Sequence, residues 1–189
     1  MTPISFKSNF ISPVNIQKKS KDDNYVGSSA SLVEIDVTND DDVFAVDDLP
    51  KLWGNKNFVS EISKNIKQIY TYADYDTPIK AYAVTLQSSH FEKLKPNKIL
   101  GIVQLDTRAE DINELDYLQV NPKYAKTYCK SSDTRSYKGI GSSLLDSIKN
   151  IYPSKKIHLT SAPSAVEFYK NNAFVQTKSN DDQDFIWNV

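Results

Sequence analysis

The order of strand-like and helix-like runs is the feature that most constrains how this chain can fold. Alternating apolar residues and helical spacing of apolar residues distinguish the two kinds of run. The predicted strands cover 31–37, 79–86, 98–106, 112–120, 156–160, 174–177 and 185–189. The predicted helices fall within 38–54, 58–70, 139–152 and 163–169. The order β-α-α-β-β-β-α-β-α-β-β predicts an α/β domain around a mixed sheet.

The N-terminal segment differs in composition from the rest of the chain. Residues 1–30 are rich in Ser, Asn, Lys and Asp and contain Pro3 and Pro13. This composition predicts an extended arm, with a short strand at 4–6, in front of a single domain over 31–189.

Composition excludes several functional classes. The formal net charge of −1 gives no overall positive field for nucleic acid or an anionic membrane. Cys129 is the only cysteine, so an internal disulfide is excluded, and two histidines argue against a zinc site; no metal is predicted. No apolar run approaches the roughly 18 residues of a membrane span, and no signal peptide is evident, so we expect a cytoplasmic protein.

A glycine turn opens the helix predicted to begin near residue 140. Gly139 and Gly141 flank Ile140, and glycine lets a ligand approach the backbone closely. The first helical N–H groups lack partners within the helix, which makes such a start a phosphate site. Lys138, Ser142 and Ser143 would add donors. The alternative is a tight turn that only lets the helix pack on the sheet.

Three segments together resemble the GNAT superfamily of N-acetyltransferases. They are Leu118-Gln119-Val120-Asn121-Pro122, Tyr137-Lys138-Gly139-Ile140-Gly141 and Ala165-Val166-Glu167-Phe168-Tyr169-Lys170-Asn171-Asn172-Ala173-Phe174. The resemblance is plain over 98–177 and extends in weaker form from 31. The chain departs from the family pattern at Ser136, where Arg or Gln is preferred, and at Ala173, where the family has Gly.

The resemblance implies a fold, a cosubstrate and a set of binding residues. The fold would be the GNAT-like acyl-CoA N-acyltransferase fold, an α/β arrangement with a mixed, mostly antiparallel sheet of six to seven strands and about four helices. Acetyl-CoA would bind through main-chain groups of one strand and through the glycine turn. The residues implied in this binding are Leu118, Gln119, Val120, Lys138, Gly139, Ile140, Gly141 and Ser142.

Two residues are candidates for the catalytic proton transfers. By the resemblance, Tyr169 would be the acid that donates to the departing sulfur. Strand alternation predicts Glu114 and Asp116 on one face with Leu118 and Val120, and the resemblance makes Glu114 the base. The alternatives are a core position for Tyr169, two solvated carboxylates on an exposed face, and water as the base.

These observations lead to three functional hypotheses. The first is an N-acetyltransferase that moves acetyl from acetyl-CoA to a primary amine by direct attack in a ternary complex. Its acceptor would be an amine-bearing small molecule, peptide or protein, and a homodimer is compatible with it. The second is a catalytically inactive GNAT-like protein that binds coenzyme A or regulates another protein. The third is an unrelated α/β nucleotide-binding protein.

Overall fold

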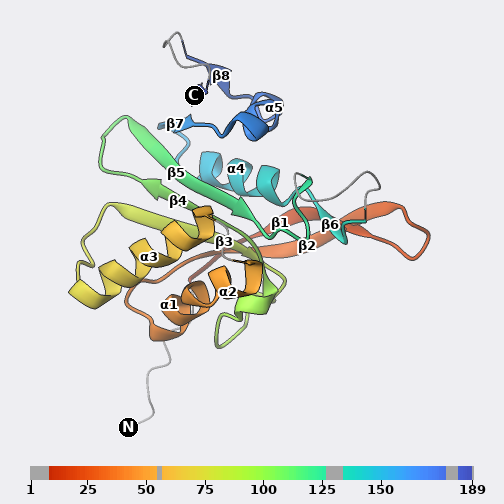
Figure 1. Ribbon diagram of the computed structural model, residues 1–189, viewed down its shortest axis with the longest axis horizontal. Coiled ribbons are helices and arrows are strands. Elements are labelled where there is room, and N and C mark those ends of the chain that lie inside the picture. The colour runs from red at the N-terminus through yellow and green to blue at the C-terminus, as the bar shows by residue number, and fades with distance from the viewer. Residues whose placement is uncertain (1–8, 55–56, 127–133, 178–182, 189) are drawn as a thin grey trace.

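A computed structural model of the chain describes all residues except 1–8, 55–56, 127–133, 178–182 and 189 (Figure 1). Within this part of the chain, nine strands form one sheet in the order β6-β1-β2-β3-β4-β5-β7-β9-β8. The pairing is antiparallel throughout, apart from the parallel pair β5–β7. The expected mixed, mostly antiparallel α/β sheet is confirmed, but with nine strands instead of six to seven.

The N-terminal strands form a long hairpin that joins the sheet. β1 (Asn9–Lys19) pairs with β2 (Tyr25–Glu34), and β2 pairs with β3 (Ile79–Thr85). The expectation that regular structure begins at 31 is therefore wrong, and the expected strand at 4–6 lies outside the described residues. The division into an arm over 1–30 and a domain over 31–189 stays a prediction.

Helices cover both faces of the sheet (Figure 1). One face carries α1 (Asp40–Asp47), α2 (Leu49–Trp53) and α3 (Asn57–Tyr72). Their buried side chains form one apolar cluster with Val33, Ala83 and Ile102 of the sheet. Local chemistry sets the boundaries of these helices. Asn39 caps α1 through a hydrogen bond from the Asp41 N–H, Pro50 occupies the first turn of α2, and Gly54 ends α2 at a φ of 79°.

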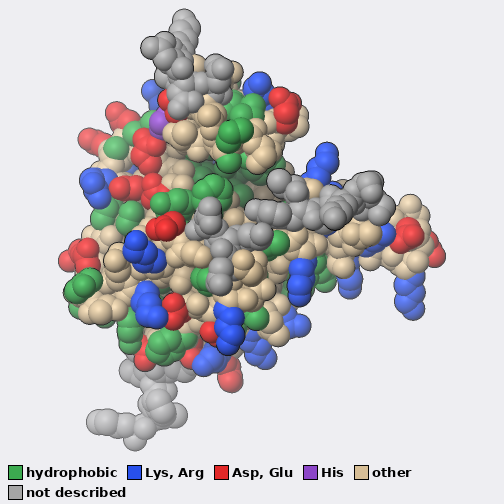
Figure 2. All heavy atoms as spheres, in the orientation of Figure 1, with side chains coloured by type: hydrophobic (Ala, Val, Ile, Leu, Met, Phe, Trp, Pro, Cys, Tyr) green, Lys and Arg blue, Asp and Glu red, His purple; other side chains and the backbone are tan. Residues whose placement is uncertain are grey.

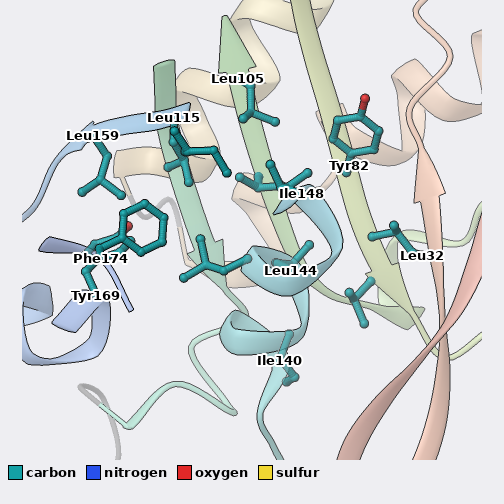
Figure 3. Close-up of a cluster of buried hydrophobic side chains, with 14 of the residues drawn as sticks. Leu32, Tyr82, Leu105, Leu115, Ile140, Leu144, Ile148, Leu159, Tyr169 and Phe174 are labelled. Carbon is teal, nitrogen blue, oxygen red and sulfur yellow. The ribbon is translucent and has the colours of Figure 1, made fainter. Parts of the chain in front are cut away.

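The opposite face carries α4 (Ile140–Ile151) and α5 (Val166–Asn171). Ile140, Leu144 and Ile148 recur every four residues, so they share one side of α4 and point onto the sheet (Figure 3). A β-carbon on Gly101 of β4 (Ile99–Asp106) would lie 2.8 Å from Ile140 Cγ2, so the glycine allows the close approach of α4 to the sheet.

The remaining strands complete the C-terminal side of the sheet. They are β5 (Ile112–Val120), β6 (Tyr137–Lys138), β7 (Lys156–Thr160), β8 (Val175–Gln176) and β9 (Asp184–Trp187). A short 3₁₀ turn, Pro163–Ala165, precedes α5. In the described part of the chain, no helix is long and apolar enough to cross a membrane.

Candidate functional site

A cleft opens where the two parallel strands of the sheet separate. β5 and β7 pair only from Ile112↔Lys156 to Glu114↔His158. Beyond these pairs β5 continues to Val120, and a cleft of about 830 Å³ lies between it, the start of α4 and the start of α5. The cleft therefore results from the sheet itself, because β5 and β7 are paired over only part of the length of β5.

A β-bulge in β5 lies at the point where the cleft begins. Gln104 of β4 is opposite Tyr117, but the next residue, Leu105, is opposite Leu115. Asp116 is thus the extra residue, and the bulge reverses the alternation of side chains that follow it. Leu115 and Leu118 both contact the apolar cluster on the α4 face, whereas Tyr117 contacts the cluster on the α3 face.

The main chain of β5 presents alternate residues to the cleft. The Asn121 N–H donates to the Leu100 carbonyl at 2.8 Å, so these opposed residues form a hydrogen-bonded pair. Because hydrogen-bonded and non-hydrogen-bonded pairs alternate in an antiparallel ladder, the N–H and C=O groups of Leu118 and Val120 point away from β4, toward the cleft. Those of Gln119 point toward β4, and its side-chain amide donates to the Val120 carbonyl at 3.0 Å.

The glycine turn forms one end of the cleft. Gly139 caps α4 in the left-handed region, at a φ of 78°, and no side chain occupies the capping position. The N–H groups at the start of α4 have no partner within the helix, and Gly139, Ile140, Gly141 and Ser142 all line the cleft. Three basic residues, Lys126, Arg135 and Lys138, line the cleft as well. This end can therefore hold a phosphate group.

Ser143 has a different place from the one expected. Its hydroxyl donates to the Asn15 carbonyl at 2.5 Å, which ties α4 to β1. It therefore stabilises the start of α4 against the hairpin instead of adding a donor to the cleft.

Tyr169 lies deep in the wall formed by α5. Its ring packs edge-on against Phe168, at a centroid distance of 5.1 Å, and against Phe174, at 5.7 Å; Figure 3 shows the Tyr169–Phe174 pair. The residue is only 7% exposed but lines the cleft, and its hydroxyl makes no hydrogen bond to any described residue. Burial raises the pKa of Tyr169 to about 12, so the phenol keeps its proton throughout the physiological range.

Glu114 lies apart from the other predicted site residues. It is not among the residues that line the cleft, and its carboxylate is 2.6 Å from Nδ1 of His158 on the neighbouring strand. The expectation that it shares a face with Leu118 and Val120 is wrong, because the bulge at Asp116 intervenes. Its role as base stays a prediction.

Glu167 of α5 and Asp116 of β5 are the acidic residues that line the cleft, and Asp116 is the one on the strand that carries Leu118 and Val120. Its Oδ2 accepts a hydrogen bond of 3.0 Å from the Gln104 side chain, which in turn accepts one of 3.2 Å from Asn65 on α3. Asp116 is exposed, yet the surrounding protein partly desolvates its carboxylate. This desolvation raises the pKa of Asp116; the Gln104 hydrogen bond opposes the shift, and the charges of Asp106 and Glu114 add to it.

The space-filling view shows where charges gather around these residues. Acidic side chains concentrate at the upper left of the face in Figure 2, where Figure 1 shows the connected ends of β4 and β5. Asp106 and Glu114 are opposed residues of these two strands. In the described part of the chain, no group of three or more His, Cys, Asp or Glu side chains could hold a metal ion. The site thus combines anion-binding groups at one end with carboxylates near the other.

Sequence reasoning missed several residues that line this cleft. Phe168 faces Gly141 closely, since a β-carbon on Gly141 would lie 2.9 Å from Phe168 Cζ. Phe58 of α3 also lines the cleft and packs against Tyr117, at a centroid distance of 6.0 Å. Lys126 follows Pro122 in a polar segment without periodicity, so no sequence signal pointed to it.

Comparisons with known proteins identify structures of similar outline but low identity. No family model matches the chain, and neither does any curated protein. Three of the similar solved structures are Ard1 from Thermoplasma volcanium, the N-acetyltransferase PseH of Campylobacter jejuni and Tetrahymena GCN5.

Ard1 is 11% identical, with a TM-score of 0.49, and PseH is 14% identical, with a TM-score of 0.48; each match covers 83% of this chain and 94% of the other. GCN5 is 10% identical over 79% of this chain and 87% of its own, with a TM-score of 0.46. At these values the likeness says nothing about activity.

Proposed function

We propose that this chain is an acetyl-CoA-dependent N-acetyltransferase of the GNAT type. The observation that carries the proposal is the continuity of one cleft. It joins the uncapped start of α4, the outward-facing main chain of Leu118 and Val120, and the phenol of Tyr169. A diphosphate, an amide-containing arm and a thioester occur in that order in acetyl-CoA, and the cleft offers a matching group to each.

Each part of the coenzyme would meet groups suited to it. N–H groups at 140–142 would bind the diphosphate, with Lys126, Arg135 and Lys138 nearby. The pantetheine amides would pair with the main chain of Leu118 and Val120 as an added strand does. One of these N–H groups would also stabilise the oxyanion that forms on the thioester carbonyl.

The chemistry needs a neutral amine and a stabilised sulfur. We assign the removal of a proton from the acceptor ammonium to Asp116, directly or through water, in place of Glu114. The amine nitrogen then bonds to the thioester carbon, the carbon–sulfur bond breaks, and the electron pair goes to sulfur. The nitrogen loses its second proton, so that the products are an amide, coenzyme A thiol and one net proton.

The high pKa of Tyr169 refines the role assigned to it. A phenol with a pKa of about 12 is a weaker acid than a thiol, whose pKa is near ~8.5 by analogy with cysteine. Complete transfer of its proton to a free thiolate is therefore uphill. We assign Tyr169 as the hydrogen-bond donor that stabilises negative charge on sulfur as it develops, with the final proton supplied by solvent or by the amine.

Two measurements test the proposal. Calorimetry is expected to show saturable binding of acetyl-CoA but not of ATP, and thiol release is expected with at least one member of an amine panel. Tyr169→Phe is expected to lower kcat by about 10- to 100-fold, because one transition-state hydrogen bond is lost, with the KM for acetyl-CoA within about twofold. Tyr72→Phe, at a position 79% exposed on α3, is the matched control.

The outcomes separate the hypotheses. Absence of acetyl-CoA binding by the wild-type protein would refute the proposal. Binding without turnover on every amine would favour the coenzyme-binding, catalytically inactive alternative. An unchanged kcat in Tyr169→Phe would remove Tyr169 from the mechanism and leave the binding site intact.

A further inference from the structure

The N-terminal hairpin holds the segment that leads into the glycine turn. β6 consists of Tyr137 and Lys138 and pairs with Lys18 and Gln17 of β1. The Lys19 N–H also donates to the Ser136 carbonyl at 2.9 Å. In Figure 1 the hairpin extends beyond the sheet, with β6 alongside it. A strand of two residues has little stability by itself, so the position of this segment depends on the hairpin.

Tyr25, at the start of β2, contacts this segment with both parts of its side chain. Its hydroxyl donates to the Arg135 carbonyl at 2.7 Å. Its ring lies beneath the Lys138 ammonium, with Nζ 3.6 Å from the ring centroid. Arg135 and Lys138 both line the cleft. One tyrosine thus fixes the backbone of one basic residue and the side chain of another on the same wall.

We propose that Tyr25 is a positioning residue for the nucleotide end of the cosubstrate. The inference rests on the proposed function and adds a part of the chain that neither the glycine turn nor the three resembling segments include. Tyr25 acts through Arg135 and Lys138 and does not itself bind the ligand. Cations that are already held in place lose less conformational entropy on binding an anion, so the affinity for the phosphates increases.

This role differs from a purely structural one in what it predicts for two ligands. S-acetyl-pantetheine has the thioester and the amide arm of acetyl-CoA but lacks the nucleotide and its diphosphate. A residue that positions the nucleotide end affects the dissociation constant of acetyl-CoA and leaves that of S-acetyl-pantetheine unchanged. A residue that only stabilises the fold affects both ligands equally.

The experiment compares both ligands by calorimetry on wild-type protein and three hairpin variants. Tyr25→Leu removes the hydrogen bond and the cation–π contact, so we expect the Kd of acetyl-CoA to increase about 5- to 20-fold. Tyr25→Phe keeps the ring and loses the hydroxyl, so we expect about a 2- to 4-fold increase. Val26→Ala, at an adjacent residue that is 50% exposed, is expected to match the wild type.

Two results would overturn the inference: an acetyl-CoA Kd in Tyr25→Leu equal to that of the wild type, or equal losses for the two ligands. If Tyr25→Leu does not fold, the same comparison of ligands in Tyr25→Phe decides the matter. Failure of the wild-type protein to bind acetyl-CoA would instead contradict the proposed function. The wild-type titration therefore tells the two failures apart.

Discussion

Replacing Gly141 by alanine would place a methyl group between α4 and the neighbouring walls of the cleft. The added β-carbon would lie 2.9 Å from Phe168 Cζ and 3.5 Å from Val120 Cγ2. Since carbon atoms pack best at about 3.5–4.0 Å, the Phe168 ring must move by roughly 0.6 Å or more. Val120 is already at ordinary contact distance from the added methyl group and limits how far that group can shift, so the Phe168 ring is displaced within the cleft that it lines.

Two terms of opposite sign determine the effect of this change on stability. Alanine in a helix is favoured over glycine by about 0.8–1.0 kcal/mol. Overpacking against Phe168 costs about 1–3 kcal/mol, at the lower end here because the contact is the far edge of a half-buried ring. We expect the free energy of unfolding to fall by no more than about 1 kcal/mol. The Kd of acetyl-CoA should increase at least tenfold, because the methyl group and the displaced ring occupy the cleft.

Gly54→Ala is the matched control for the Gly141 substitution. Gly54 has a φ of 79° and nothing within 4 Å of an added β-carbon, so the change strains the backbone by about 1–2 kcal/mol without a steric contact. Thermal unfolding and calorimetric titration should show a less stable protein with unchanged affinity. For Gly141→Ala they should show nearly unchanged stability with reduced affinity. Wild-type affinity in Gly141→Ala would refute the assignment of this gap to the ligand.

Three further predictions concern the carboxylates and the core. Asp116→Asn is expected to reduce kcat/KM at least tenfold, and Glu114→Gln is expected to reduce it less than threefold. Initial rates at a fixed acetyl-CoA concentration would measure both values. A larger loss in Glu114→Gln than in Asp116→Asn would restore Glu114 as the base. Because the fold raises the pKa of Asp116, its ionised carboxylate destabilises the folded state above that pKa. Asp116→Asn should therefore stabilise the protein at pH 7. Urea unfolding near pH 3, where the wild-type carboxyl is protonated, should show no such gain in stability. Leu144→Ala should lower the free energy of unfolding by about 2–5 kcal/mol in the same assay, since Leu144 is fully buried; a loss below about 1 kcal/mol would show that α4 is not anchored there.

Local sequence was sufficient for the elements with strong periodicity or clear ends. The strand at 112–120 and the end of α4 before Pro153 lie where the sequence predicts them. The glycine turn lies at the start of α4, and the predicted coenzyme-binding residues from both segments line one cleft. The strand, the helix end and the glycine turn depend on residues close together in the chain, whereas the meeting of 118–120 with 138–142 was expected only from the resemblance.

The bulge at Asp116 was beyond the reach of sequence reasoning. The alternation of apolar and polar residues over 112–120 is interrupted at Asn113-Glu114 and at Tyr117-Leu118, but which residue is the extra one becomes visible only against the partner strand β4. The bulge decides which carboxylate of β5 lies at the cleft. Glu114 lies next to His158, and Asp116 occupies the place at the cleft that alternation would have given to both.

The hairpin was missed for a related reason. β1 contains Pro13 and few apolar residues, which is unusual for a strand in the interior of a sheet. β1 pairs with β2 along most of its length but with β6 only at Gln17 and Lys18, so Pro13 lies where β1 has no second partner among the described strands. Its pairing partners, rather than its own composition, make this segment a strand.

The short contact between β5 and β7 has a mechanical consequence. Three opposed residue pairs join the strand that begins the C-terminal unit, β7 to β9 with α5, to the main body of the sheet. A ligand that contacts both walls of the cleft would link β5 to the C-terminal unit. Its binding energy would therefore oppose the separation of β7 from β5. We therefore expect the amide hydrogens of β8 and β9, at the far edge of the sheet, to exchange more slowly with ligand bound than without it.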